Sequence, residues 1–243
     1  MKQYYIVLLL FIGTLHSITL EKFTYHTKFR NLRVGNTKIE ILKDEQQQTI
    51  LKINSSTNKF IDLIYKLRHF STVIVNDIDF SLVASTQKLQ QGKYIDSYNA
   101  TVDYNLKHII YQNTRDIKYA LSQNQLIIPI DSLVYDPFSI VYYLREFDLQ
   151  TGERYHFTTY NKDKLRNIEL YIEKIEPLRT PYINTDCFVV VPSAKESGPL
   201  LKHQGEMKIW FTTDHQHIPI KIQVKMKHGI MELTLKDYVH NNK

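Results

Sequence analysis

The chain has 243 residues, of which 43% are hydrophobic and 23% charged, so it is long enough to bury a core and too apolar to be disordered. Its formal net charge of +6 is modest and its basic residues are spread out, which argues against a nucleic-acid-binding protein. Tyr is frequent, with 17 residues, and Gly is rare, with 7. This balance favours β-strands and argues against a glycine-rich nucleotide-binding fold.

The first segment predicts an export signal. Residues 5–15, "YIVLLLFIGTL", are an apolar run after a short basic start, and Ser17 is a small residue at its end. The run is shorter than the roughly 20 apolar residues that a membrane anchor needs. We therefore expect a cleaved signal peptide over residues 1–17 and one mature domain over residues 18–243, without a membrane span, in the periplasm or outer envelope. No Cys lies near residue 17, so a lipoprotein is not expected.

Alternation predicts a hairpin at the start of the mature domain. Residues 23–42, "FTYHTKFRNLRVGNTKIEIL", alternate on both sides of "VGN". Gly35 and Asn36 are residue types that tolerate the positive φ of tight turns, so we expect the turn there. A third strand is expected over residues 48–56.

The spacing of the apolar residues changes from alternation to a helical period over residues 57–70, "TNKFIDLIYKLRHF". Thr57 or Asn58 is a suitable N-cap, and the spacing predicts one amphipathic helix whose apolar stripe packs on a sheet. A lipid-surface role for this helix is less favoured, because its polar face carries only two Lys and one Arg. The residues at helical spacing are Phe60, Leu63, Ile64, Leu67 and Phe70.

Strand-like runs resume over residues 72–121, and Pro129 argues against a central strand over residues 126–137. A second, short helix is predicted in "DPFSIVYYLREF", where Asp136 is a suitable N-cap and Pro137 a suitable first helical residue. Six further strands are expected, over residues 154–160, 167–173, 186–191, 205–212, 218–227 and 231–240, with a loop over residues 192–204.

About a dozen evenly spaced strands and two helices predict a mainly β fold. We expect one antiparallel, strongly curved sheet or half-barrel with the helices on its open side.

Three segments resemble the domain of unknown function 3108 family of exported bacterial proteins. They are "FTYHTKF…VGN", "DPFSIVYYLR" and "GEMKIWFTTDHQHIPIKIQVK…GIMELTLKDY" (residues 205–238). The resemblance implies a β-rich envelope protein and assigns no activity. The predicted architecture is also analogous to the curved-sheet lipoprotein carriers and lipid-binding proteins of the bacterial envelope.

Asp136, Ser139 and Arg145 are candidate site residues on the second helix. One interpretation is an acidic–basic constellation beside a pocket, with Asp136 at the helix start, where exposed N–H groups favour an anion. The favoured interpretation is structural: Asp136 caps the helix and Arg145 makes a charged hydrogen bond to a neighbouring segment.

The run "IWFTTDHQHIPIKIQVK" (residues 209–225) offers His215 and His217 as candidate metal ligands, since an H-x-H on a strand places both rings on one face. A zinc site needs three or four ligands, however, and no other motif supplies them. Thr, Asp214 and Pro instead favour a turn, with Trp210 on the strand before it. No metal or other cofactor is therefore expected, and Trp210 is expected on the face opposite Ile209.

Nucleophilic catalysis has little support. There is no G-x-S-x-G, and Cys187, the only Cys, lies in an apolar run and is expected in the core. We therefore expect a non-catalytic envelope protein that binds an apolar or amphipathic ligand, such as a lipid, or an envelope protein in the concavity of the sheet. The alternatives are a hydrolase or metal-dependent enzyme acting on envelope glycans or lipids, and an assembly factor that works through a sheet edge.

Overall fold

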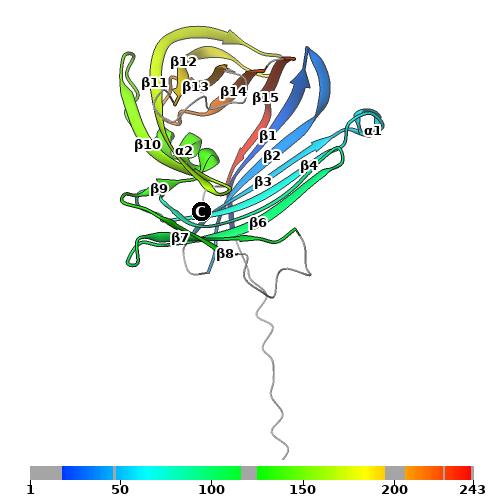
Figure 1. Cartoon of the computed structure of the whole chain (residues 1–243). Coiled ribbons are helices and arrows are strands. Elements are labelled where there is room, and N and C mark those ends of the chain that lie inside the picture. Colours follow the sequence, from blue (N-terminus) through cyan, green and yellow to red (C-terminus); the bar gives the residue numbers. More distant parts are fainter. Residues whose placement is uncertain (1–17, 46–47, 116–124, 195–205, 227, 242–243) are drawn as a thin grey trace, which may run out of the picture.

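The computed structural model describes residues 18–45, 48–115, 125–194, 206–226 and 228–241. Within these residues one sheet of fifteen strands accounts for most of the chain, with two short α-helices and one 3₁₀ helix (Figure 1). The predicted class, a mainly β fold built on one curved sheet, is confirmed. The expected signal peptide, residues 1–17, and most of the predicted loop, residues 195–204, lie outside the described residues.

The strands of the N-terminal half follow one another as a meander. They are β1 (Ile18–Phe29), β2 (Leu32–Lys43), β3 (Thr49–Thr57), β4 (Leu67–Val75), β5 (Leu82–Gln91), β6 (Tyr94–Asp103), β7 (His108–Asn113) and β8 (Gln125–Pro129). A four-residue helix, α1 (Lys59–Asp62), lies in the β3–β4 loop.

The C-terminal half begins with β9 (Val134–Tyr135), α2 (Pro137–Tyr143) and the 3₁₀ helix η1 (Leu144–Glu146). It continues with β10 (Arg154–Asn161), β11 (Lys164–Arg179), β12 (Asn184–Ser193), β13 (Glu206–Thr212), β14 (Pro219–Met226) and β15 (Gly229–His240). The prediction of a wholly antiparallel sheet is wrong at one place, because the short strand β9 pairs parallel with β10.

The strand order shows why the sheet is curved. It runs β8-β7-β6-β5-β4-β3-β2-β1-β15-β14-β13-β12-β11-β10-β9, so the first and last strands meet in the middle and the two edges are β8 and β9. These edge strands are consecutive in the chain and are separated only by residues 130–133. Such a link spans at most about 18 Å, whereas fourteen inter-strand spacings in a flat sheet would cover roughly 67 Å. The sheet must therefore curl until its edges approach each other.

Contacts between the two halves hold the curled sheet in place. The Lys162 ammonium, at the β10–β11 turn, forms an ion pair of 2.6 Å with Asp96 of β6, whose side chain is buried. The hydroxyl of Tyr104, in the β6–β7 turn, donates to the carbonyls of Leu82 and Val134 at 3.0 and 3.3 Å. Segments from opposite ends of the strand order thus meet across the concave side.

Helix α2 lies inside the curve of the sheet (Figure 1). Its residues Ser139–Tyr142 are buried, and the Tyr142 ring packs 5.1 Å from the ring of Phe23 on β1. Tyr25 and Tyr160 are among the largest fully buried side chains. Many of the abundant tyrosines therefore belong to the packed interior.

The predicted first hairpin is present, but its turn is not at Gly35. The chain turns at Arg30 and Asn31, which both have positive φ, and Gly35 lies inside β2. A Cβ at position 35 would meet the backbone oxygen of Ser56 at 2.1 Å. The glycine is therefore needed because β2 and β3 approach closely beside a bulge. It is not needed for a turn, as the sequence had suggested.

The predicted helix over residues 57–70 is wrong. Only α1 is helical, and Leu67 already begins β4, which pairs with β3 and β5 along its length. The hydrogen bonds of these two ladders outweigh the helical spacing of the apolar side chains. No helix in the described parts of the chain is long and apolar enough to cross a membrane.

We predict that Gly35→Ala lowers the free energy of unfolding by about 2 kcal/mol, because its methyl group would overlap the Ser56 carbonyl. Urea unfolding measures the loss. Asn99→Ala, at an exposed strand position, is the control. Equal losses in the two variants would contradict the close-approach explanation.

Candidate functional site

Asp136 and Ser139 form the start of α2. The Asp136 carboxylate accepts hydrogen bonds from the N–H groups of Phe138 and Ser139 at 2.7 and 3.4 Å, and the Ser139 hydroxyl donates to the Asp136 carbonyl at 2.9 Å. Both residues are buried. Burial raises the pKa of Asp136 to about 6, although the two backbone hydrogen bonds act in the opposite direction. The pair therefore has the geometry of a helix cap, as the structural interpretation of the sequence expects.

Arg145 follows α2 and binds Glu21 of β1. Two guanidinium nitrogens donate to the two carboxylate oxygens at 2.7 and 2.8 Å, and both side chains are 12% exposed. The Tyr238 hydroxyl of β15 donates to the same carboxylate at 2.6 Å. Burial alone would raise the pKa of Glu21, but the hydrogen bonds and charge of Arg145, aided by Tyr238 and His240, lower it to about 2. This bidentate ion pair ties α2 and η1 to the strands where the two halves of the sheet meet.

The segment around Asp214 is a turn. Its carboxylate accepts hydrogen bonds from the Thr212 hydroxyl at 2.9 Å and from the Gln216 N–H at 3.0 Å. Arg145 reaches this turn, since its Nε donates to the Gln216 carbonyl at 2.9 Å and its own carbonyl lies 3.2 Å from Nδ1 of His217. Two sequence-predicted candidates, Arg145 and the 214–217 turn, are thus brought together.

The two histidines of this turn have different surroundings. His215 is exposed, whereas His217 is buried, adopts a positive φ of 43° and faces the Arg145 carbonyl. Among the described residues no group of three or more His, Cys, Asp or Glu side chains could hold a metal ion. His215 and His217 are therefore best described as turn residues.

Trp210 and Cys187 lie in the wall of the sheet. Trp210 is 6% exposed; its indole N–H donates to Glu176 at 2.8 Å, and the Lys221 ammonium lies 5.1 Å from the ring centre. Side chains of neighbouring strands, rather than a helix, therefore contact it. Cys187 is fully buried, and burial raises the pKa of its thiol to about 12, so the thiol is protonated at neutral pH.

A half-buried aromatic cluster lies beside α2, and reasoning from the sequence missed it. Five of its six rings fall within residues 135–157, where seven of 23 residues are aromatic, against 12% in the whole chain. That local density was the available signal. The sixth ring belongs to the β4–β5 loop and could not be placed from sequence. The aromatic cluster comprises Phe80, Tyr135, Tyr143, Phe147, Tyr155 and Phe157.

The rings of the aromatic cluster contact one another directly. Tyr143 stacks on Phe80 at 5.2 Å and on Tyr135 at 6.0 Å, while Phe147 meets Tyr143 and Tyr155 edge to face, each at 5.0 Å. Burial raises the pKa of Tyr135 to about 12, and it also raises that of Tyr143. The hydroxyls are therefore protonated at neutral pH and can donate hydrogen bonds.

The charges that act on the aromatic cluster are acidic. Asp79 contributes to the raised pKa values of Tyr135 and Tyr143, and Glu146 also acts on Tyr143. Tyr155 is similarly affected by Glu153, to which its hydroxyl donates a hydrogen bond, and by Asp148. The cluster thus combines an apolar surface with a negative field.

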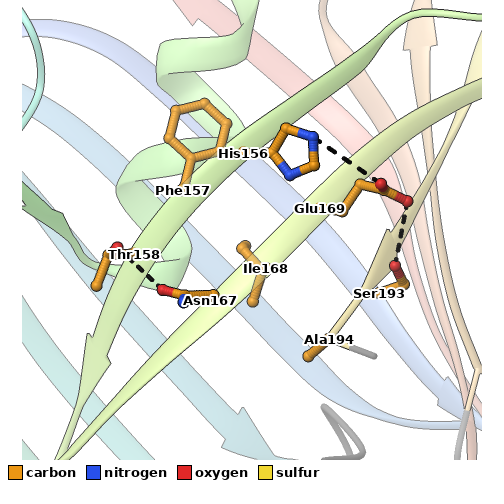
Figure 2. Close-up of a pocket in the computed structure, with 8 residues that line it drawn as sticks. All are labelled: His156, Phe157, Thr158, Asn167, Ile168, Glu169, Ser193 and Ala194. Carbon is orange, nitrogen blue, oxygen red and sulfur yellow. Dashed lines mark hydrogen bonds and ion pairs between the residues drawn. The ribbon is translucent and has the colours of Figure 1, made fainter. Parts of the chain in front are cut away.

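A pocket of about 380 Å³ lies along β10, β11 and the end of β12 (Figure 2), and Phe157 of the aromatic cluster is one of its lining residues. Its polar side chains do not form a catalytic triad. Glu169 lies between His156, at 4.0 Å, and the Ser193 hydroxyl, at 3.5 Å (Figure 2). The serine hydroxyl therefore faces a carboxylate, and the imidazole is not placed to accept its proton as in a triad. The last lining residue in the chain, Ala194, precedes residues 195–205, which are not described. The lining residues are His156, Phe157, Thr158, Asn167, Ile168, Glu169, Ser193 and Ala194.

Comparison with known proteins identifies the family. The family model described as "Protein of unknown function (DUF3108)" matches residues 24–236, most of the chain. The chain belongs to the DUF3108 family. The resemblance seen in its opening hairpin, its DPF helix and its Trp-containing strand is thereby confirmed. A search of curated protein sequences found no match for this DUF3108 protein.

A solved structure shares the fold of this DUF3108 protein. It is the crystal structure of a β-barrel-like protein of domain of unknown function DUF1849 from Brucella abortus. The TM-score is 0.63 at 9% sequence identity, and the match covers 93% of this chain and 99% of that one. At this identity the likeness concerns the fold alone: a curved, barrel-like sheet.

We predict that the stability of the protein falls as the pH rises from about 4 to about 6, through Asp136. Its pKa is 3.8 ordinarily and about 6 in the fold, so between these two values the unfolded chain ionises while the folded chain still holds the proton, and stability falls until both states are ionised above about pH 6. Asp136→Asn, which keeps a capping side chain, should gain about 2 kcal/mol relative to wild type between pH 4 and pH 7. Denaturant melts at both pH values measure this. Asp131→Asn, at an exposed position, serves as control, and a gain that does not change with pH would refute the assignment.

The Glu21–Arg145 pair should contribute in the opposite direction. Because the pKa of Glu21 is lowered from 4.5 to about 2, its contribution is present above pH 4.5 and is lost as the pH falls towards 2. Arg145→Met should cost about 3 kcal/mol at pH 7, since it leaves a largely buried carboxylate without its cation. Glu21→Gln/Arg145→Met should cost clearly less than the sum of the single variants in urea melts. Additive costs would contradict coupling between the two side chains.

Proposed function

We propose that this DUF3108 protein is an exported, non-catalytic protein of the bacterial envelope that binds an apolar or amphipathic ligand. The ligand would contact the aromatic cluster, between α2 and the edges of the curved sheet. The observation that carries the proposal is the cluster itself: six rings from five chain segments, most of them only half-buried, packed beside a helix inside the sheet. Export is supported by the apolar run of residues 5–15.

The aromatic cluster is suited to binding because it is already assembled. Its rings are fixed by mutual contacts of 5.0–6.3 Å and by the secondary structure that carries them. Little binding free energy is therefore lost in ordering the protein when a ligand binds. Stacked and edge-to-face rings offer a flat apolar surface, and the tyrosine hydroxyls offer hydrogen bonds at its border.

Phe80 supports this proposal through its backbone. It adopts a φ of 55°, which is rare for a bulky side chain, in a loop where its N–H donates to the Asn76 carbonyl at 3.0 Å. Strained backbone of this kind is concentrated at ligand-binding positions. Here the strain brings the Phe80 ring onto Tyr143.

The acidic surroundings narrow the chemistry of the ligand. Asp79, Glu146 and Asp148 would repel an anionic group near the rings. The ligand class that fits is an apolar or amphipathic molecule whose polar part is neutral or cationic.

Ligand binding can be tested with Nile red, an uncharged apolar dye, and by native mass spectrometry of protein purified from the periplasm. We expect dye binding and a co-purifying lipid-sized molecule, and we expect Phe147→Ala/Tyr155→Ala to weaken dye binding about tenfold or more. Phe70→Ala/Tyr182→Ala, which removes two exposed aromatic rings outside both the aromatic cluster and the exposed loops around α1, should leave it unchanged. Unaltered dye affinity in the first variant, with no co-purifying molecule, would overturn the proposal.

A further inference from the structure

The β3–β4 loop exposes an unusual amount of apolar surface. Phe60, Leu63 and Ile64 are 83, 85 and 86% exposed. They are the residues expected on the buried stripe of a helix, yet they project from the tip of a hairpin, where α1 lies at the margin of the molecule (Figure 1). Three adjoining large apolar side chains in water need an explanation, whereas single exposed ones do not.

Neighbouring turns extend this surface. The Asn58 N–H donates to the Val34 carbonyl beside the β1–β2 turn at 2.9 Å, and the Gly92 N–H of the β5–β6 turn donates to the Lys66 carbonyl at 2.8 Å. Both turns also expose apolar residues. Together they form what we call the docking rim: Leu32, Phe60, Leu63, Ile64, Tyr65 and Ile95.

Hydrogen bonds fix the loop that presents the docking rim. The Asp62 carboxylate accepts from Arg68 at 2.9 and 2.5 Å and from the Thr57 hydroxyl at 2.6 Å. The Thr57 hydroxyl in turn accepts from the Leu67 N–H at 2.9 Å, and Asn58 caps α1. The polar side chains are thus satisfied at the base of the loop, which leaves the apolar ones pointing outward.

The docking rim is bordered by cations. Residues 30–33, 58–66 and 91–95 contain one acidic residue, Asp62, and Arg68 neutralises it. The cations of these three segments are all exposed: Arg30, Arg33, Lys59, Lys66 and Lys93. Apolar side chains that project from a fixed loop and are flanked by cations match the boundary between anionic headgroups and acyl chains.

We infer that the docking rim binds the surface of an anionic lipid membrane, with Phe60, Leu63 and Ile64 entering the acyl boundary and the surrounding cations contacting headgroups. The shape favours lipid over a protein partner, because projecting side chains enter a deformable surface without needing a matching pocket. This inference is independent of ligand binding at the aromatic cluster.

The test is co-sedimentation of the chain from Ile18 to Lys243, which contains every described element, with vesicles of phosphatidylglycerol or of phosphatidylcholine. We expect binding to phosphatidylglycerol that weakens with salt, and little binding to phosphatidylcholine. Leu63→Ser/Ile64→Ser should raise the half-saturating lipid concentration about tenfold or more. Because both side chains are more than four-fifths exposed, thermal melts should show the variant folded.

Matched variants decide the outcome. Ile78→Ser/Leu106→Ser removes equally apolar, exposed side chains from the other end of the strands and should bind as wild type. Lys59→Glu/Lys66→Glu should abolish binding, whereas Lys107→Glu/Lys236→Glu, with the same change in charge, should retain most of it. Equal losses in the matched pairs, or no sedimentation with phosphatidylglycerol, would overturn the inference. Phe147→Ala/Tyr155→Ala should bind vesicles normally, which separates this inference from the proposed function.

Discussion

The short link between β8 and β9 is the constraint on which this architecture depends. A meander of eight strands and a second set of strands are joined through β1 and β15, which leaves the two free edges at consecutive positions in the chain. With only residues 130–133 between them, the edges cannot separate as the twist of so wide a sheet would require. Curvature and a concave interior follow from this connection, whereas the parallel pairing of β9 with β10 goes with the α2 crossover that joins these two strands.

Helix α2 occupies the interior that this closure creates, and each of its ends is fixed differently. The buried Asp136 satisfies the first N–H groups, at the cost of a carboxylate in apolar surroundings. Arg145 beyond the other end joins β1, β15 and the 214–217 turn through Glu21 and Gln216. A buried ion pair is weak evidence for stability but can specify one arrangement. Here the Glu21–Arg145 pair fixes the position of α2 against β1 and β15. That position places Tyr143 in the aromatic cluster.

The sequence predicted most of what depends on neighbouring residues and little of what depends on distant ones. Alternation located most strands, and the Asp-Pro pair located α2 and its cap. Helical spacing misled at residues 57–70, because Leu67 and Phe70 belong to β4, where pairing with β3 and β5 decides the conformation. Gly35 was assigned to a turn because the group that requires a glycine there, the Ser56 carbonyl, lies on another strand. Arg145 was a candidate, but its partner Glu21 lies 124 residues away, and the six rings of the aromatic cluster meet only after the sheet has curled.

The two proposed surfaces lie at opposite ends of β4, and this separation limits how they could cooperate. The docking rim adjoins the start of the strand at Leu67, and the loop that carries Phe80 follows its end at Val75. Nine extended residues span roughly 30 Å, about the thickness of the hydrocarbon core of a bilayer. If β4 stands upright on the membrane, a chain docked through the rim holds Phe80, and with it the aromatic cluster, far from the lipid. The cluster could not extract a ligand directly from that membrane, so the ligand would have to arrive through water, from a second surface or from a partner protein. The charges of the two surfaces agree with separate roles. The basic docking rim favours anionic headgroups, whereas the acidic surroundings of the aromatic cluster favour a neutral or cationic ligand.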